Sequence, residues 1–258
     1  MMRTKGKRTE SLFFCLGILA AGMFFQAGGL LKGNRVVFPP VSEILQALIR
    51  LLEEGTTWTK IITTLVHVAE ALAVSAAAGI LIGLAEGLSR SVYAFFRPVM
   101  ILIRSMPMIV TVILIMSALS YKSVPVTAAS LILIPAFSEA VYEGCRSLDP
   151  ELMDVYRLNG GFGPFVARKV YLPLISGYLR QAFVQSAGTG LKICVSAEYL
   201  VQTKNSLGKA VYSSGYFSEY AEIYAYALIM VFLVLALTEI PPFLLRTIKR
   251  KKGFRQEP

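Results

Sequence analysis

The 258-residue sequence has few charged residues: Asp, Glu, Lys and Arg make up only 16% of it, whereas soluble domains usually contain about a quarter. Hydrophobic residues make up 55% of the chain, and the mean hydropathy is +0.61. This balance argues against an ordinary soluble domain and favours an integral membrane protein. The net charge of +10 could point to nucleic acid. However, the basic residues cluster at the chain ends and between apolar runs, so we expect no nucleic-acid partner.

Cysteine and histidine are also scarce. The three cysteines, Cys15, Cys145 and Cys194, have no CxxC spacing, which favours free buried thiols over a disulfide framework or a metal site. The single histidine, His67, has no companions that would complete a metal site. A packed or polar-facing role is therefore expected for it, and no Ser/His/Asp arrangement can be assembled.

The chain also lacks a phosphate-cradling loop, which requires the pattern G-x-x-x-x-G-K-[ST]. Gly208-Lys209 is followed by Ala210, and Thr203 stands where the first glycine is needed. We therefore expect a chain that is not an enzyme and binds no cofactor, so that any ATP it depends on is hydrolysed by a separate subunit.

Long apolar runs are what the sequence has in abundance, and a membrane-spanning helix needs about 20 mostly apolar residues. A basic start and an apolar core at residues 1–31 also fit a cleaved signal peptide, but the run is long and no small-x-small cleavage site follows it. We predict an all-α polytopic protein with a transmembrane domain over 12–245, a tail at 1–11 and a basic tail at 246–258. The six predicted spans are 12–31, 61–84, 95–119, 124–142, 174–201 and 220–245.

The distribution of Lys and Arg predicts the orientation. With a cytoplasmic N-terminus, the inside segments hold 16 of these residues and the outside segments hold 7. Both termini are therefore predicted to face the cytoplasm, as does the segment between the fourth and fifth spans. The basic tail at 246–258 is expected to contact anionic membrane lipid.

That inside segment, 149–173, carries strong helix signals. Asp149 is a good N-cap and Pro150 suits the first helical position, while Gly160 and the glycine after it end the helix. The expected helix over 150–159 has an apolar side made of Leu152, Val155, Tyr156 and Leu158. The pattern predicts a helix–turn–helix elbow with a docking face. An amphipathic helix lying on lipid headgroups is the alternative.

The elbow resembles the coupling motif of ABC-importer permeases, which reads Glu-Ala-Ala, three residues, Gly, nine residues, Ile, one residue, Leu-Pro. Here the same spacing is filled by Asp154-Val155-Tyr156, Gly160, Val170 and Leu172-Pro173. The first three positions depart from the family pattern, because Asp replaces Glu and the bulkier Val-Tyr replaces Ala-Ala.

Other stretches resemble the permease branch that serves nitrate, sulfonates, taurine and bicarbonate. They are VVFPPVSEIL at 36–45, the run at 83–109, CRSLDPELMDVYRLNG at 145–160, AEYL at 197–200 and SLG at 206–208. The resemblance implies the type I importer fold, in a bacterial inner membrane. It also implies three protein partners: a second permease copy, a cytoplasmic ATPase that receives the elbow, and an extracytoplasmic binding protein. The implied cargo is a small anion such as a sulfonate, taurine or nitrate, and a vitamin precursor is the alternative.

Charged residues inside apolar spans are candidates for the substrate pathway, because each costs roughly 2.5–3.5 kcal/mol at a bilayer centre on insertion scales. Lys192 is the leading one, since a buried cation would suit an anionic substrate; a structural ion pair with Glu70 is the competing interpretation. Arg104 precedes Pro107, where a proline break would open a helix beside the pathway. Further charges in or near spans are Glu139 and Glu198, and the candidate pathway residues are Lys192, Arg104, Glu70 and Glu198.

Two further patterns predict packing and surface. Gly79, Gly83 and Gly87 recur every four residues, which allows close helix approach. Within residues 34–60, leucine and isoleucine recur at helical spacing, which predicts an amphipathic helix. That helix would either form part of the outer mouth or lie on the bilayer.

Two other classes of protein compete with the permease. A secondary transporter driven by an ion gradient predicts an internal repeat with paired broken helices, and no convincing repeat is present. A membrane-embedded enzyme requires a cluster of catalytic polar residues, which the sequence lacks.

Overall fold

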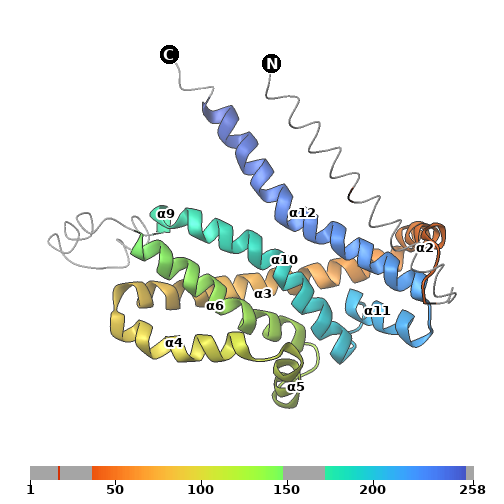
Figure 1. Ribbon diagram of the computed structural model, residues 1–258, viewed down its shortest axis with the longest axis horizontal. Coiled ribbons are helices and arrows are strands. Elements are labelled where there is room, and N and C mark those ends of the chain that lie inside the picture. The colour runs from red at the N-terminus through yellow and green to blue at the C-terminus, as the bar shows by residue number, and fades with distance from the viewer. Residues whose placement is uncertain (1–16, 18–36, 148–171, 254–258) are drawn as a thin grey trace. The chain divides into compact units, whose positions relative to one another are not determined.

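The computed structural model describes residues 37–147 and 172–253, together with Gly17. Every element in these ranges is a helix, so the predicted all-α class is confirmed (Figure 1). The helices are α2 (Val41–Glu53), α3 (Gly55–Leu88), α4 (Arg90–Ser105), α5 (Met108–Ala118), α6 (Val124–Arg146), α9 (Leu172–Leu174), α10 (Ser176–Val201), α11 (Leu207–Tyr216) and α12 (Tyr220–Gly253).

Helices occupy the predicted span ranges that fall within the described residues, with shifted boundaries. The range 61–84 lies inside α3, which has 34 residues and is about 51 Å long at 1.5 Å per residue. This length exceeds the roughly 30 Å hydrocarbon core of a bilayer, because polar residues at both ends continue the helix beyond its apolar run. The first predicted span, 12–31, and most of the elbow at 149–173 lie outside the described residues.

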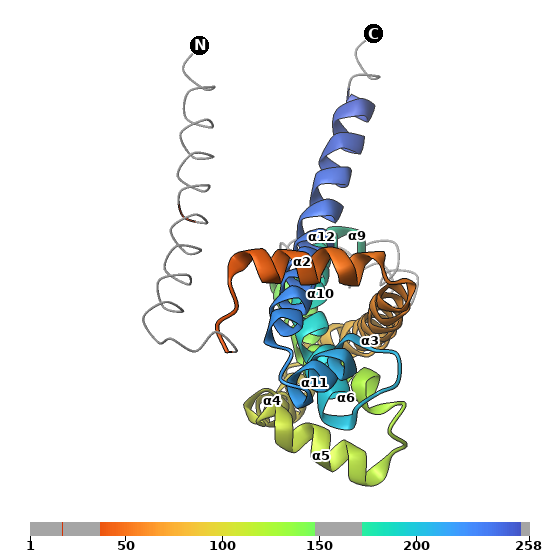
Figure 2. The same ribbon diagram turned by 90° about the vertical axis from the view of Figure 1, so that its right-hand side faces the viewer.

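The predicted span 95–119 is two helices rather than one. Helix α4 ends at Ser105, α5 begins at Met108, and their axes are bent by 103°. Met106 is extended (φ −69°, ψ 128°), as expected for a residue that precedes a proline. Pro107 therefore produces the predicted break. The bend is clear when the views are compared, since α4 is seen along its length in Figure 1 and α5 in Figure 2.

Hydropathy singles out some of these helices as membrane-crossing. In the described ranges, Gly55–Leu88, Val124–Arg146 and Tyr220–Glu239 are long and apolar enough to span a bilayer, and the bent pair α4–α5 counts as a fourth if taken as one span. Helix α10 is not among them although it has 26 residues. It carries exposed polar side chains along one face, which are described with the candidate site.

The chain divides into two compact units, one made of Met1–Trp58 and Ala210–Met230, the other of Thr59–Lys209 and Val231–Pro258. In the second unit α6 and α10 pack along each other (Figure 1). In this contact Phe137 of α6 packs with Ala182 of α10 and meets the Phe183 ring edge to face, and Ala128 of α6 packs with Ala197 of α10. Burying such apolar side chains stabilises the pair by about 25 cal/mol per Å² of apolar area.

Helices α3 and α6 approach closely along the predicted glycine repeat. A Cβ atom placed on Gly83 would lie 2.5 Å from the carbonyl oxygen of Ser138, and one on Gly87 would lie 2.6 Å from Cβ of Cys145. The Gly79 position is blocked in the same way by Phe137. The repeat therefore serves packing within the subunit, because only glycine leaves room for the facing backbone of α6.

In the first unit, α2 is the predicted amphipathic helix. It buries Ile44, Ala47 and Leu51 and exposes apolar side chains such as Leu45 and Ile49. An ion pair joins Arg50 of α2 to Glu222 of α12, and the hydroxyl of Ser214 donates a 2.9 Å hydrogen bond to the same carboxylate.

The negative charge of Glu222 also raises the pKa of neighbouring Glu219 above its ordinary value. Because of this neighbouring charge, Glu219, which directly precedes α12, is more readily protonated than an isolated glutamate.

Candidate functional site

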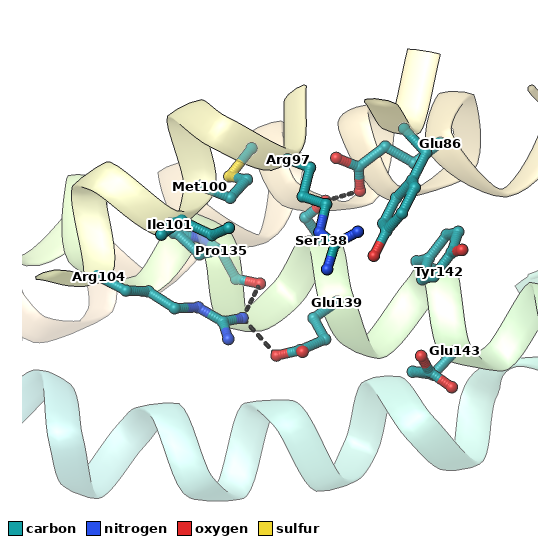
Figure 3. A pocket seen from close by; sticks show the side chains of 11 residues that line it. Glu86, Arg97, Met100, Ile101, Arg104, Pro135, Ser138, Glu139, Tyr142 and Glu143 are labelled. Carbon is teal, nitrogen blue, oxygen red and sulfur yellow. Dashed lines mark hydrogen bonds and ion pairs between the residues drawn. The ribbon is translucent and has the colours of Figure 1, made fainter. Parts of the chain in front are cut away.

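An ion pair between α4 and α6 lies at the centre of the candidate site (Figure 3). Nη2 of Arg104 contacts a carboxylate oxygen of Glu139, and it also donates a 3.1 Å hydrogen bond to the backbone carbonyl of Pro135. Arg104 is the penultimate residue of α4, so the Pro107 break that ends this helix determines where the guanidinium stands. The side chains of Arg104 and Glu139 remain 44% and 58% exposed.

This pair borders two cavities of the second unit. The first has a volume of about 260 Å³ and lies among α3, α4 and α6. The second has a volume of about 570 Å³ and lies among α4, α6 and α10. Arg104, Glu139 and Glu143 line both cavities. We call these three residues the charged cluster.

The first cavity has further polar and aromatic walls, shown in Figure 3. The hydroxyl of Ser138 donates a 2.5 Å hydrogen bond to the buried carboxylate of Glu86. The rings of Tyr93 and Tyr142 are stacked with centroids 4.2 Å apart, and the Arg97 guanidinium lies 5.8 Å from the Tyr93 ring centroid. Cation–π contact of this kind keeps a guanidinium against its ring.

The second cavity is lined on the α10 side by polar residues at helical spacing. Gln181, Gln185 and Thr189 line it, and Lys192 and Ser196 continue the row with steps of three and four residues. All five side chains are exposed, whereas Ala187 and Cys194 on the opposite side of α10 are buried. We call these five residues the polar stripe. Because α10 falls in the predicted span 174–201, its polar stripe is expected to face water or another protein surface rather than lipid.

Lys192 belongs to the polar stripe and is exposed, and so is Glu70 on α3. In the described part of the chain, ion pairs join Arg50 to Glu222, His67 to Glu198 and Arg104 to Glu139. Lys192 and Glu70, both of which the structure describes, are therefore not paired, and the interpretation of Lys192 as part of a structural ion pair with Glu70 is wrong.

Glu198 lies elsewhere, in a buried network that joins α10 to α3 and to the start of α11. Its carboxylate has no exposed surface. It accepts hydrogen bonds from Oγ1 of Thr64 at 2.9 Å and from the backbone N–H of Gly208 at 3.2 Å, and it contacts Nδ1 of His67 at 2.7 Å. The Leu207 N–H completes the network by donating to Oγ1 of Thr64 at 3.0 Å.

Gly208 is required at its position in this network. A Cβ atom there would lie 2.5 Å from both Cβ of Glu198 and the backbone nitrogen of Tyr199. Protein groups engage both oxygens of the carboxylate, so this arrangement links the end of α10 to α3 and to the start of α11.

The predicted ATPase-coupling residues lie largely outside the described residues. These are Asp149, Pro150, Leu152, Asp154, Val155, Tyr156, Leu158, Gly160 and Val170. Leu172 and Pro173 are described: they begin the short helix α9, which precedes α10. A turn at Ile175 separates α9 from α10.

The candidate pathway residues from the sequence omitted several groups that the structure brings together. Glu139 was noted as an intramembrane charge, but Glu143 and the glutamines of the polar stripe were not. Their signal was present: Glu139 and Glu143 are four residues apart, and positions 181, 185 and 189 repeat with the same period. A helical-wheel reading of α6 and α10 places each set on one face.

Taken together, the long apolar helices, the broken helix and the polar cavities between helices define the class of polytopic helical membrane proteins. The family described as "Binding-protein-dependent transport system inner membrane component" matches residues 75–253. The chain belongs to this family, because the match covers more than half of its length. The resemblance of the sequence to importer permeases is thereby confirmed, while the nitrate, sulfonate and taurine branch stays a prediction.

Solved structures agree on the fold. The chain is similar to a chain of the MetNI methionine ABC transporter in inward-facing conformations, in the CY5 native crystal form (18% identity, TM-score 0.60) and in the CY5 SeMet soak crystal form (19% identity, TM-score 0.60). The matches cover 79% and 78% of this chain and 97% of each transporter chain. No curated protein sequence matches this chain.

Proposed function

We propose that this chain is the permease subunit of an ATP-driven ABC importer. It forms the membrane pathway, and a separate cytoplasmic ATPase subunit hydrolyses the ATP. The observation that carries this proposal is the elbow motif, which keeps the spacing of Asp154, Gly160, Val170 and Leu172-Pro173 and lies within the matched family region 75–253.

The elbow is suited to transmit force. The sequence predicts that Asp149 and Pro150 cap its first helix and that the apolar side of that helix would provide a docking surface. A stiff, capped helix that docks in a cleft of the ATPase would move as a rigid body when the ATPase closes on ATP. Because Leu172 and Pro173 begin α9, which precedes α10, such a movement would be passed to α10, which carries the polar stripe.

The cargo that we propose is a small polar solute with an anionic group, such as a sulfonate, taurine or nitrate. Supporting observations are the exposed cation Lys192 on the polar stripe and the guanidinium of Arg104 beside two cavities. Both residues are proposed to line the pathway, whereas Glu70 is a weaker candidate because it lines neither cavity.

The importer architecture also implies the other partners. An extracytoplasmic binding protein would deliver the solute, and a second copy of this chain would complete the pathway. We propose that both termini and the elbow face the cytoplasm, as the distribution of Lys and Arg predicts.

Copurification tests the function directly. The tagged chain is coexpressed with candidate ATPase subunits from the same genome. Gly160→Asp and Tyr156→Asp are expected to abolish recovery of the partner ATPase by placing a charge in the docking surface. Gly55→Asp is the matched control, since a Cβ at Gly55 meets no atom within 4 Å.

The proposal fails if the ATPase is recovered equally with all variants, or if solute uptake continues in cells that lack any such ATPase. Uptake that collapses with the proton or sodium gradient, but not with loss of the ATPase, would instead indicate a secondary transporter.

A further inference from the structure

We propose that the charged cluster of Arg104, Glu139 and Glu143 is a binding point for a small zwitterion, in which the anionic group of the solute meets Arg104 and its ammonium group meets the two carboxylates. This inference rests on the proposed transport function and narrows its cargo from anions in general to solutes such as amino acids and aminosulfonates.

The first argument is location. Arg104 and Glu139 lie within predicted spans, yet 44% and 58% of their side-chain surfaces are exposed. Charged groups at membrane depth are stable only where they face a water-filled space or one another. Here they border cavities of about 260 and 570 Å³, so solute entering either cavity reaches the same three side chains.

The second argument is the balance of charge. Three carboxylates and two guanidinium groups line the first cavity. One of the carboxylates, Glu86, is buried and engaged by Ser138, and one of the guanidinium groups, Arg97, lies over the Tyr93 ring. The first cavity thus has three carboxylates for two guanidinium groups, and the second, lined by the charged cluster alone among charged residues, has two carboxylates for one. A simple anion would meet excess negative charge there, whereas a zwitterion would complement both signs.

The third argument is unused bonding capacity. Both hydrogen bonds of the Arg104 side chain within the described residues come from Nη2, which leaves the remaining N–H donors of the guanidinium for an anionic group. Guanidinium groups bind carboxylates and sulfonate-like oxyanions through paired donors. In the same part of the chain, no hydrogen bond or ion pair engages the Glu143 carboxylate.

The fourth argument is spacing. Pro135, Glu139 and Glu143 are separated by four residues each on α6, which places them on one face about 6 Å apart per step. Figure 3 shows Arg104 at the Pro135 end of this row and Glu143 at the other end. A solute whose charges are separated by a few bonds would reach from Arg104 to the glutamates. Its anionic group would replace the Glu139 carboxylate as the partner of the Arg104 guanidinium.

The test is direct binding to the purified permease–ATPase complex in lipid nanodiscs, without a binding protein. The probes are two zwitterions, taurine and β-alanine, and their monopolar counterparts ethanesulfonate, propionate and ethylammonium. We expect both zwitterions to bind at least about tenfold more tightly than their counterparts, the size of effect that one additional charge-assisted contact produces.

Two substitutions test which residue binds each end of the solute. Arg104→Gln is expected to abolish binding of every anionic probe. Glu143→Gln is expected to reduce the preference for taurine over ethanesulfonate about tenfold while binding of ethanesulfonate itself is retained. Arg180→Gln is the matched control for Arg104, because it is an exposed arginine of α10 that lines neither cavity.

The proposal is overturned if neither zwitterion binds, if ethanesulfonate binds as tightly as taurine, or if Glu143→Gln leaves the preference unchanged. Copurification of the ATPase with each variant separates these results from the proposed function: when the ATPase is recovered and zwitterion preference is absent, the transport role stands and this inference fails. Loss of the ATPase from the wild-type chain would instead contradict the transport role.

Discussion

Nδ1 of His67 lies 2.7 Å from Oε1 of Glu198, so the single histidine of the chain meets a carboxylate that has no exposed surface. The two residues are 131 positions apart and belong to α3 and α10. Because Thr64 and the backbone of Gly208 bind the other oxygen of the same carboxylate, one side chain ties three helices together. Its role is to hold the end of α10 in place.

Replacing Glu198 should therefore destabilise the protein. Glu198→Ala leaves the Thr64 hydroxyl, the His67 ring and the Gly208 N–H without their acceptor, which should cost about 3 kcal/mol. The measurement is thermal unfolding of the purified protein in detergent, in which the midpoint should fall by several degrees.

Glu70→Ala is the control for this substitution, because Glu70 is exposed on α3 and its loss should change stability by less than about 0.5 kcal/mol. Equal midpoints for both variants would show that the Glu198 network contributes nothing to stability.

The glycine contact between α3 and α6 yields a second prediction. Gly83→Ala introduces a methyl group 2.5 Å from the Ser138 carbonyl and 2.7 Å from Cβ of Val141. Overpacking of this kind should cost about 1–3 kcal/mol, to be measured as a lower unfolding midpoint.

Gly177→Ala provides the matched comparison, because a Cβ on Gly177 in α10 meets no atom within 4 Å. Alanine should be tolerated there and should raise stability by up to about 1 kcal/mol through helix propensity. If Gly83→Ala were as stable as Gly177→Ala, α3 and α6 would not pack as closely as the structure shows.

Lys192 provides the third prediction, which concerns transport. On the polar stripe its ammonium group is exposed, and removing it should weaken attraction for an anionic cargo. Lys192→Ala is expected to lower uptake of the radiolabelled cargo about tenfold, assayed in cells with expression checked by immunoblot.

Arg180→Ala is the control, since Arg180 is an exposed cation of the same helix that lies off the polar stripe. Unchanged uptake by Lys192→Ala at normal expression would remove Lys192 from the pathway.

Several features of this fold were readable from sequence because they depend on local chemistry. Apolar runs predicted the positions of α3, α6 and α12, and Pro107 predicted the break between α4 and α5, since a proline disfavours helical geometry in the residue before it. The four-residue spacing of Gly79, Gly83 and Gly87 predicted a close helix contact. Each of these signals lies within a few turns of a single helix.

Other features required the tertiary structure, because they join residues that are distant in the chain. The sequence offered Glu70 as the partner of Lys192, yet Arg104 pairs with Glu139, and Glu198 pairs with His67. Choosing among several intramembrane charges depends on how the helices are rotated about their axes, and composition carries no such information.

The sequence alone thus determined the membrane class, the order of the helices and the elbow spacing, because hydrophobicity, proline and glycine act locally. Only the tertiary structure decided which charged side chains bind other groups inside the protein and which line the cavities. The rotation of α4, α6 and α10 in the packed unit turns Glu198 into the buried network and leaves Arg104, Glu139 and Glu143 accessible to solute.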